Sequence, residues 1–286
     1  MKQRTRRPAQ AKSRPSTASN AKKGNGVKAL TARNADRHAL YEIAVQRPEV
    51  ILGLIDELAG MLELPKRRVL REDFCGTAYL SAHWAASDAE RRAVGVDIDA
   101  DTLAWARAHN RDPLGDAARR IELIEDDVLN VRKRADVLVS LNFSHYIYKA
   151  RSELLGYLKH ARRCIKPGGF MVLDAFGGPG SIEASVDRRN FSMFEYQWEQ
   201  EAINPLTHEI ACHIHFRFRN GSKLQRAFSY DWRMWSLPEL RELLSEAGFD
   251  DLGIYFESED GFIGDADAVE LHAWVAYLVA LRHPTG

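Results

Sequence analysis

The chain has 286 residues, of which 45% are hydrophobic and 28% are charged, so it is long enough for a large domain with a sizeable core. No apolar stretch approaches the roughly 18 residues that a membrane-spanning helix needs, so we expect no membrane segment. The three cysteines, Cys75, Cys164 and Cys212, are too few and too scattered for a disulfide framework or a four-cysteine zinc site. These features favour a cytoplasmic protein without a metal centre.

The charge is distributed unevenly along the chain. Residues 1–30 contain nine of the 40 Lys and Arg residues and none of the 40 Asp and Glu residues, which leaves a net charge of −9 on residues 31–286. Because this segment holds almost no large apolar side chains, we expect residues 1–30 to be a disordered basic tail. Such a tail could bind nucleic acid or an acidic surface, or it could be a solvated extension. The acidic remainder disfavours nucleic acid as the main partner.

Two short helices are predicted within residues 31–66, because apolar residues recur there at spacings of three and four on both sides of Pro48. From residue 68 onward, short apolar runs alternate with helical patterns. The predicted strands lie at 68–70, 93–98, 121–124, 135–141 and 170–175. The predicted helices between them lie at 77–86, 100–109 and 150–165. This alternation indicates an α/β, doubly wound (Rossmann-like) fold with a mostly parallel sheet, in a domain formed by residues 67–286.

The period of the apolar pattern changes between about residue 190 and residue 235. Apolar and polar residues alternate there in three runs, and Asn220-Gly221 between the last two runs is typical of a β-hairpin. We therefore predict a three-stranded antiparallel insertion. Ser236 and Glu239 then form the capping box of a helix, and two more strands follow at about 252–257 and 272–281. The main sheet thus has seven predicted strands.

Candidate functional residues follow the ends of the first four strands, where ligands bind in open parallel sheets. Gly76, in the turn after the first strand, lets the backbone approach a ligand closely. Asp97 ends the second strand and can accept hydrogen bonds from two ribose hydroxyls. Asp126-Asp127 follows the third strand, and Asn142 follows the fourth. Each acidic residue could instead be a helix cap or a turn residue.

The order of these motifs resembles that of the class I S-adenosylmethionine-dependent methyltransferases. The resemblance runs from about residue 68 to the end of the chain. It implies that the last of the seven strands is antiparallel, that the cofactor is S-adenosyl-L-methionine and that the insertion is a lid over the active site. The motifs that carry it are Cys75-Gly76-Thr77, Gly95-Val96-Asp97, Asp126-Asp127, Ser140-Leu141-Asn142, Lys166-Pro167-Gly168-Gly169 and Glu246-Ala247-Gly248-Phe249.

The resemblance also implies roles for individual residues. The methionine part of the cofactor would be held by Glu72, Phe74, Cys75, Gly76 and Thr77. Asp97 would bind the ribose, with Ile98 beside the adenine, while Asp127 would accept from the adenine amino group, with Val128 packed nearby. Asn142 would lie near the transferred methyl group, and Tyr41 on the N-terminal helices would cover the cofactor. The loop departs from the family's pattern, because Phe74 and Ala78 stand where glycines are usual.

The acceptor side is less clearly marked. His145 and Tyr146 follow the fourth strand, and a neutral imidazole there could take a proton from an amine or hydroxyl. Trp232 and Arg233 belong to the aromatic-rich insertion, which suits a flat or cationic small molecule, although its aromatics could equally form the core of the insertion. The sequence favours methylation of a nitrogen or oxygen atom on a small molecule. The alternatives are an RNA or protein methyltransferase that uses the basic tail, and a non-catalytic binding module.

Overall fold

The computed structural model describes residues 29–61, 68–258, 261–264 and 272–283. The predicted basic tail therefore lies almost entirely outside the described residues and stays a prediction. Within the described part, no helix is both long and apolar enough to cross a membrane.

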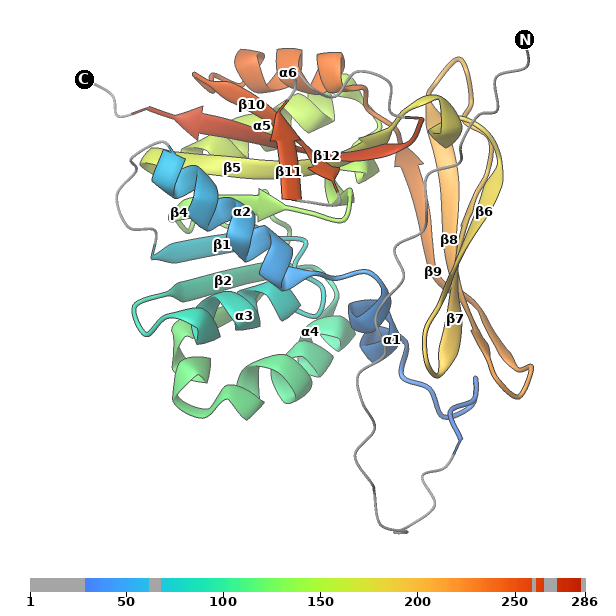
Figure 1. Ribbon diagram of the computed structural model, residues 1–286. Coiled ribbons are helices and arrows are strands. Elements are labelled where there is room, and N and C mark those ends of the chain that lie inside the picture. Colours follow the sequence, from blue (N-terminus) through green and yellow to red (C-terminus); the bar gives the residue numbers. More distant parts are fainter. Residues whose placement is uncertain (1–28, 62–67, 259–260, 265–271, 284–286) are drawn as a thin grey trace.

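A mixed sheet of eight strands forms the centre of the molecule (Figure 1). Its strand order is β11-β10-β12-β5-β4-β1-β2-β3. Five adjacent strands, β5, β4, β1, β2 and β3, are parallel to one another. Strand β12 is antiparallel to both β5 and β10. The bounds are β1 Val69–Asp73, β2 Arg92–Asp97, β3 Ile121–Glu125, β4 Ala135–Ser140, β5 Ile165–Gly177, β10 Leu252–Ser258, β11 Gly261–Gly264 and β12 Trp274–Arg282. All seven predicted strands are present, and the antiparallel last strand is confirmed.

The eighth strand, β11, was not predicted. It is only four residues long and pairs with β10 as a short antiparallel hairpin, within the segment between the last two predicted strands. Its glycines at both ends give no alternating apolar pattern.

Helices cover both faces of this sheet, as the doubly wound prediction requires. On one face, α2 (Pro48–Met61) and α3 (Tyr79–Ser87) pack on the core around Leu70, Val137 and Val172. On the other face, α5 (Arg151–Cys164) and α6 (Leu237–Glu246) pack on Leu138, Met171 and Leu173. Helix α4 (Ala100–Ala106) continues into a π-turn at Arg107–Arg111. Ser236 and Glu239 form the predicted capping box of α6.

A second, antiparallel sheet forms the insertion, which we call the lid sheet, and stands beside the main sheet in Figure 1. Its strands are β6 Ser185–Asn190, β7 Phe194–Gln200, β8 Glu209–Phe218 and β9 Lys223–Arg233. The prediction of three strands was therefore wrong by one. The missed strand β6 is exposed along most of its length, so its sequence lacks the apolar alternation that marks the other three.

The N-terminal helix α1 (Arg37–Ala44) packs on the lid sheet. Its buried residues Leu40 and Ala44 join a core with Phe194, Ile214 and Phe216. Asp36 caps the helix by accepting from the backbone N–H groups of two residues in its first turn. Helix α1 therefore belongs structurally to the lid sheet, while α2 belongs to a layer of the main sheet.

Candidate cofactor and acceptor site

The turn after β1 has the backbone shape of a glycine-rich loop although it holds one glycine. Phe74, Gly76 and Ala78 have φ values of 58°, 51° and 52°, so three alternate positions are left-handed. Left-handed backbone is costly for any residue but glycine. The Phe74 ring packs against Tyr157, with ring centroids 5.6 Å apart, and it does not line the cavity described below. The Phe74 ring therefore belongs to the packing around Tyr157, and none of the loop residues 74–78 lines that cavity.

Asp97 is fixed against this loop. Its Oδ2 atom accepts a hydrogen bond of 2.7 Å from the backbone N–H of Gly76, and its Oδ1 atom accepts from the backbone N–H of Asp99.

Cys75 is buried, and a Cβ atom at Gly95 would lie only 2.9 Å from its sulfur. Burial raises the pKa of the Cys75 thiol well above its ordinary value. Cys75 is thus a packing residue that needs Gly95, and its thiol stays protonated.

Glu72 lies on β1 at the inner end of the site. Its Oε2 atom accepts hydrogen bonds from the backbone N–H of Ser81, at 3.0 Å, and from the Ser81 hydroxyl, at 2.5 Å. Burial, together with the nearby charge of Asp97, raises the pKa of the Glu72 carboxyl to about 7. A cation placed beside this carboxylate would favour its ionised form.

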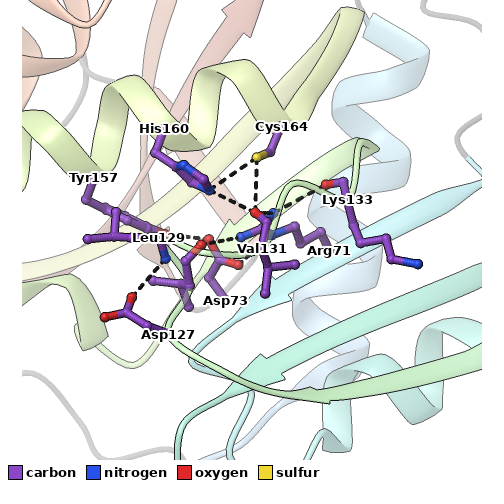
Figure 2. A network of polar contacts seen from close by, with 10 residues as sticks. Arg71, Asp73, Asp127, Leu129, Val131, Lys133, Tyr157, His160 and Cys164 are labelled. Carbon is purple, nitrogen blue, oxygen red and sulfur yellow. Dashed lines mark hydrogen bonds and ion pairs between the residues drawn. The ribbon is translucent and has the colours of Figure 1, made fainter.

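The loop that carries Asp127 is held from inside the protein by Arg71 (Figure 2). The fully buried guanidinium pairs with Asp73 at 2.6 Å and donates to the backbone carbonyls of Val128, at 2.9 Å, and Val131, at 2.7 Å. Asp127 accepts from the backbone N–H of Leu129 and is exposed at the end of β3. The Arg71 guanidinium thereby fixes the backbone that directly follows Asp127.

A cavity of about 930 Å³ extends from β1 to the lid sheet. The predicted site residues that line it are Tyr41, Glu72, Asn142 and Trp232. The rest of its wall comes from β5 and the residues after it, residues 45–51, Leu80, the turn after β4, lid strands β6–β9, Glu257 of β10, and β12 with the residues before it. Asp97, Ile98, Asp127 and Val128 do not line it, but lie at the carboxyl ends of β2 and β3. The negative charge of Asp97 contributes to the raised pKa of Glu72, so the end of β2 and the cavity interact electrostatically.

The turn after β4 is also left-handed. Asn142 and Phe143 have φ values of 55° and 58°, and neither is glycine. Asp174, on the neighbouring strand β5, accepts from the backbone N–H of Asn142 at 2.7 Å and of Phe143 at 2.8 Å. Two hydrogen bonds to one buried carboxylate thus hold Asn142 at the cavity wall.

The other acceptor-side candidates lie outside the lining of this cavity. His145 is fully buried, neither ring nitrogen has a hydrogen-bond partner among the described residues, and burial lowers its pKa to about 3. The Tyr146 hydroxyl donates to the backbone carbonyls of Phe176 and Trp235. Arg233 stacks over the Trp235 ring at 3.7 Å. Tyr146 and Arg233 therefore both contact Trp235, just after lid strand β9, while the His145 ring packs against Tyr146.

Aromatic side chains form the lid wall of the cavity. Trp232 and Tyr230 stack with ring centroids 4.3 Å apart, and the Tyr230 hydroxyl is hydrogen-bonded to that of Tyr41 on α1. The side-chain amide of Asn110 donates to Glu42 on α1 at 2.6 Å and to the backbone carbonyl of Thr77 at 2.8 Å. Helix α1 therefore connects the lid wall to the turn after β1.

Sequence reasoning missed two groups at this cavity. Asp174 is the single acid in the apolar run that predicts β5, and that exception was a usable signal. Arg47 and Glu257 form an ion pair at the cavity wall, although 210 positions separate them in the sequence. No local pattern relates two residues that far apart.

The fold and site define a class of α/β proteins that bind ligands at the carboxyl ends of their strands. Within that class, residues 75–171 match the family model described as "Methyltransferase domain". No curated protein sequence matches the chain. This part of the chain is therefore similar to a methyltransferase domain, in agreement with the resemblance that the order of the motifs indicates.

Several solved structures share the fold. An S-adenosylmethionine-dependent methyltransferase from Clostridium acetobutylicum superposes with a TM-score of 0.66 at 15% identity, over 87% of this chain and 98% of that one. The amino pentose methyltransferase CalS10 from Micromonospora echinaspora gives 0.62 at 14% identity, over 86% and 95%. The sugar N-methyltransferase KedS8 from a Streptoalloteichus species gives 0.60 at 15% identity, over 94% and 100%. These three structures share the fold of this chain over most of its length.

Proposed function

We propose that this chain transfers a methyl group from S-adenosylmethionine to a nitrogen or oxygen atom of a small molecule. The observation that carries the proposal is the continuous cavity, which begins at Glu72 beside the left-handed loop and ends at the aromatic lid wall. Its volume of about 930 Å³ is at the upper end of the range for ligand pockets, which is roughly 300–1,000 Å³. The methionine end of a donor and a small acceptor would both fit in it.

The residues at the ends of β2 and β3 fit the adenosine part of the cofactor. Both Asp97 oxygens are already held by backbone N–H groups, and each keeps a lone pair for a ribose hydroxyl. Ile98 is 74% exposed and Leu129 is 38% exposed, although both are large apolar residues. They follow adjacent strands, where an adenine ring would cover them. The exposed Asp127 would accept from the adenine amino group.

The chain's own residues then position the reactants and exclude water. S-adenosylmethionine supplies an activated methyl group, so no residue has to form a covalent bond. Glu72 would receive the ammonium of the methionine part, and Asn142, fixed by Asp174, would lie beside the reacting carbon. Trp232 and Tyr230 would shield that carbon from solvent. His145 has no part in this proposal, because it is fully buried outside the cavity lining.

The names of two structural neighbours support a small-molecule acceptor. One methylates an amino pentose and another is a sugar N-methyltransferase. This chain covers 95% and 100% of their lengths. An aromatic-walled lid sheet suits such compact acceptors better than a polymer, which would need an open groove.

The test is the melting temperature with and without saturating S-adenosylmethionine. A ligand at about 100 times its dissociation constant stabilises the native state by about 2.7 kcal/mol. At roughly 2–4 °C per kcal/mol, we expect the melting temperature to rise by about 5–10 °C. NADH serves as the control, because the turn after β1 lacks the G-x-G-x-x-G pattern. No rise at millimolar S-adenosylmethionine would exclude the proposed function and favour a binding module without this cofactor.

A further inference from the structure

The Asp174 carboxylate is a buried anion on the wall of the cavity. It is 6% exposed and lies on β5, opposite Tyr277 of β12, just beyond the end of β4. Both oxygens accept backbone N–H groups, which orients the carboxylate and leaves further lone pairs on it. Burial raises the pKa of the Asp174 carboxyl to about 7.

No positive side chain among the described residues neutralises this anion. The titratable groups that face it are three tyrosines, Tyr41 from α1, Tyr146 from the turn after β4, and Tyr277. Arg47, immediately before α2, is engaged by Glu257 and Tyr277. A buried carboxylate without a counter-charge is costly, so the site favours a ligand that brings a positive charge.

The rest of the cavity wall also favours a positively charged ligand. Its described wall has five acidic side chains against three arginines, so its charge is negative overall. Tyr41, Tyr196, Trp198, Tyr230 and Trp232 supply aromatic faces, which attract cations. The acids are Glu72, Asp174, Glu183, Asp187 and Glu257, and the bases are Arg47, Arg188 and Arg189.

We propose that the methyl acceptor is an amine, that its ammonium group binds Asp174, and that Asp174 takes the ammonium proton before transfer. This inference rests on the proposed function. An N–H bond breaks and its proton moves to an Asp174 oxygen. The nitrogen lone pair then forms the new N–C bond as the C–S bond of S-adenosylmethionine breaks, and that bonding pair stays on sulfur. The products are the methylated ammonium ion and S-adenosylhomocysteine.

The proton balance favours an amine over a hydroxyl. An alkylammonium group has a pKa of about 10, close enough to that of Asp174 for the carboxylate to accept its proton. An aliphatic hydroxyl is a far weaker acid, and a neutral hydroxyl would leave the charge of Asp174 uncompensated. His145 offers no alternative base, since burial lowers its pKa to about 3 and it lies outside the cavity lining.

The experiment is a calorimetric titration of the protein, saturated with S-adenosylhomocysteine, with two matched pairs of probes. The pairs are cyclohexylamine with cyclohexanol, and benzylamine with benzyl alcohol. We expect each amine to bind about tenfold more tightly than its alcohol, and Asp174→Asn to remove this preference. Glu201→Gln removes one negative charge from an exposed residue outside the cavity lining, and it should leave the preference unchanged.

Equal affinity for amine and alcohol, absence of amine binding, or an undiminished preference in Asp174→Asn would each overturn the inference. Failure of S-adenosylhomocysteine itself to bind would overturn the proposed function as well. If Asp174→Asn does not fold, the pH dependence of amine binding to the wild-type protein tests the inference instead. Its amine preference should grow between about pH 5.5 and about pH 8.5 as Asp174 ionises, and a flat preference would contradict the assignment.

Discussion

Asp97 Oδ2 and the backbone N–H of Gly76 are joined by a hydrogen bond of 2.7 Å, so the end of β2 is tied directly to the turn after β1. The same turn is tied to α1 through Asn110, which donates to both Thr77 and Glu42. Three parts of the proposed cofactor site are therefore connected by hydrogen bonds within the protein. This preorganisation reduces the ordering that a ligand must impose when it binds.

Replacement of Asp97 tests the ribose contact. Asp97→Ala removes the proposed acceptor of the ribose hydroxyls and also releases Gly76, so we expect S-adenosylmethionine affinity to fall at least about tenfold, or about 1.4 kcal/mol. The matched control is Asp99→Ala. Asp99 caps α4 through the backbone N–H of Thr102, so its loss should cost about 1 kcal/mol of stability without changing affinity. Calorimetry and urea unfolding separate the two effects, and equal affinity losses would refute the ribose assignment.

Gly76→Ala tests the conformation of the loop. A Cβ atom at Gly76 would meet no heavy atom within 4 Å, so the expected loss of about 1–2 kcal/mol in the free energy of unfolding comes only from the left-handed backbone. Ala78→Gly should change stability little, because relief of its left-handed strain offsets the added chain flexibility. Urea unfolding measures both variants. A neutral Gly76→Ala would mean that this turn is not left-handed in solution.

The helices and strands that have a clear local sequence pattern could be predicted from the sequence. Strands β1–β5 are apolar runs separated by helical patterns, and Ser236 with Glu239 begins α6 as a capping box. Asp97 and Gly76 could be nominated because the carboxyl ends of parallel strands meet at one edge of the sheet. That rule places both residues at the same edge of the sheet, and the structure joins them by a hydrogen bond.

The rest depends on contacts between distant segments. Strand β6 is exposed, so no apolar alternation distinguishes it from a loop. His145 follows β4 just as Asn142 does, yet the turn directs one side chain into the core and the other to the cavity. The role of Asp174 depends on the pairing of β4 with β5, which brings it to the backbone of Asn142. Sequence periodicity carries none of this information.

Removal of Arg71 tests the support of the Asp127 loop. Arg71→Met leaves Asp73 without its buried partner and leaves the carbonyls of Val128 and Val131 without a donor, so we expect a loss of about 3–5 kcal/mol in stability. Addition of Asp73→Asn should recover part of the loss, because the buried charge is then gone and Tyr157 can still donate to the amide oxygen. Urea unfolding of both proteins provides the comparison. If the double variant is no more stable than the single one, the ion pair does not account for the loss.

The pH dependence of stability tests the environment of Glu72. Burial raises the pKa of Glu72 from its ordinary 4.5 to about 7 in the native protein, so between these values the native state binds a proton that the unfolded state has released. The contribution of Glu72 is therefore fully present below about pH 4.5 and is lost as pH rises to about 7, at no more than about 1.4 kcal/mol per pH unit. Glu72→Gln keeps an oxygen that can accept from Ser81 and removes the titration. Urea unfolding from about pH 4 to about pH 8 should thus show the wild-type protein losing stability relative to Glu72→Gln. Parallel curves would mean that the native and unfolded pKa values of Glu72 are equal.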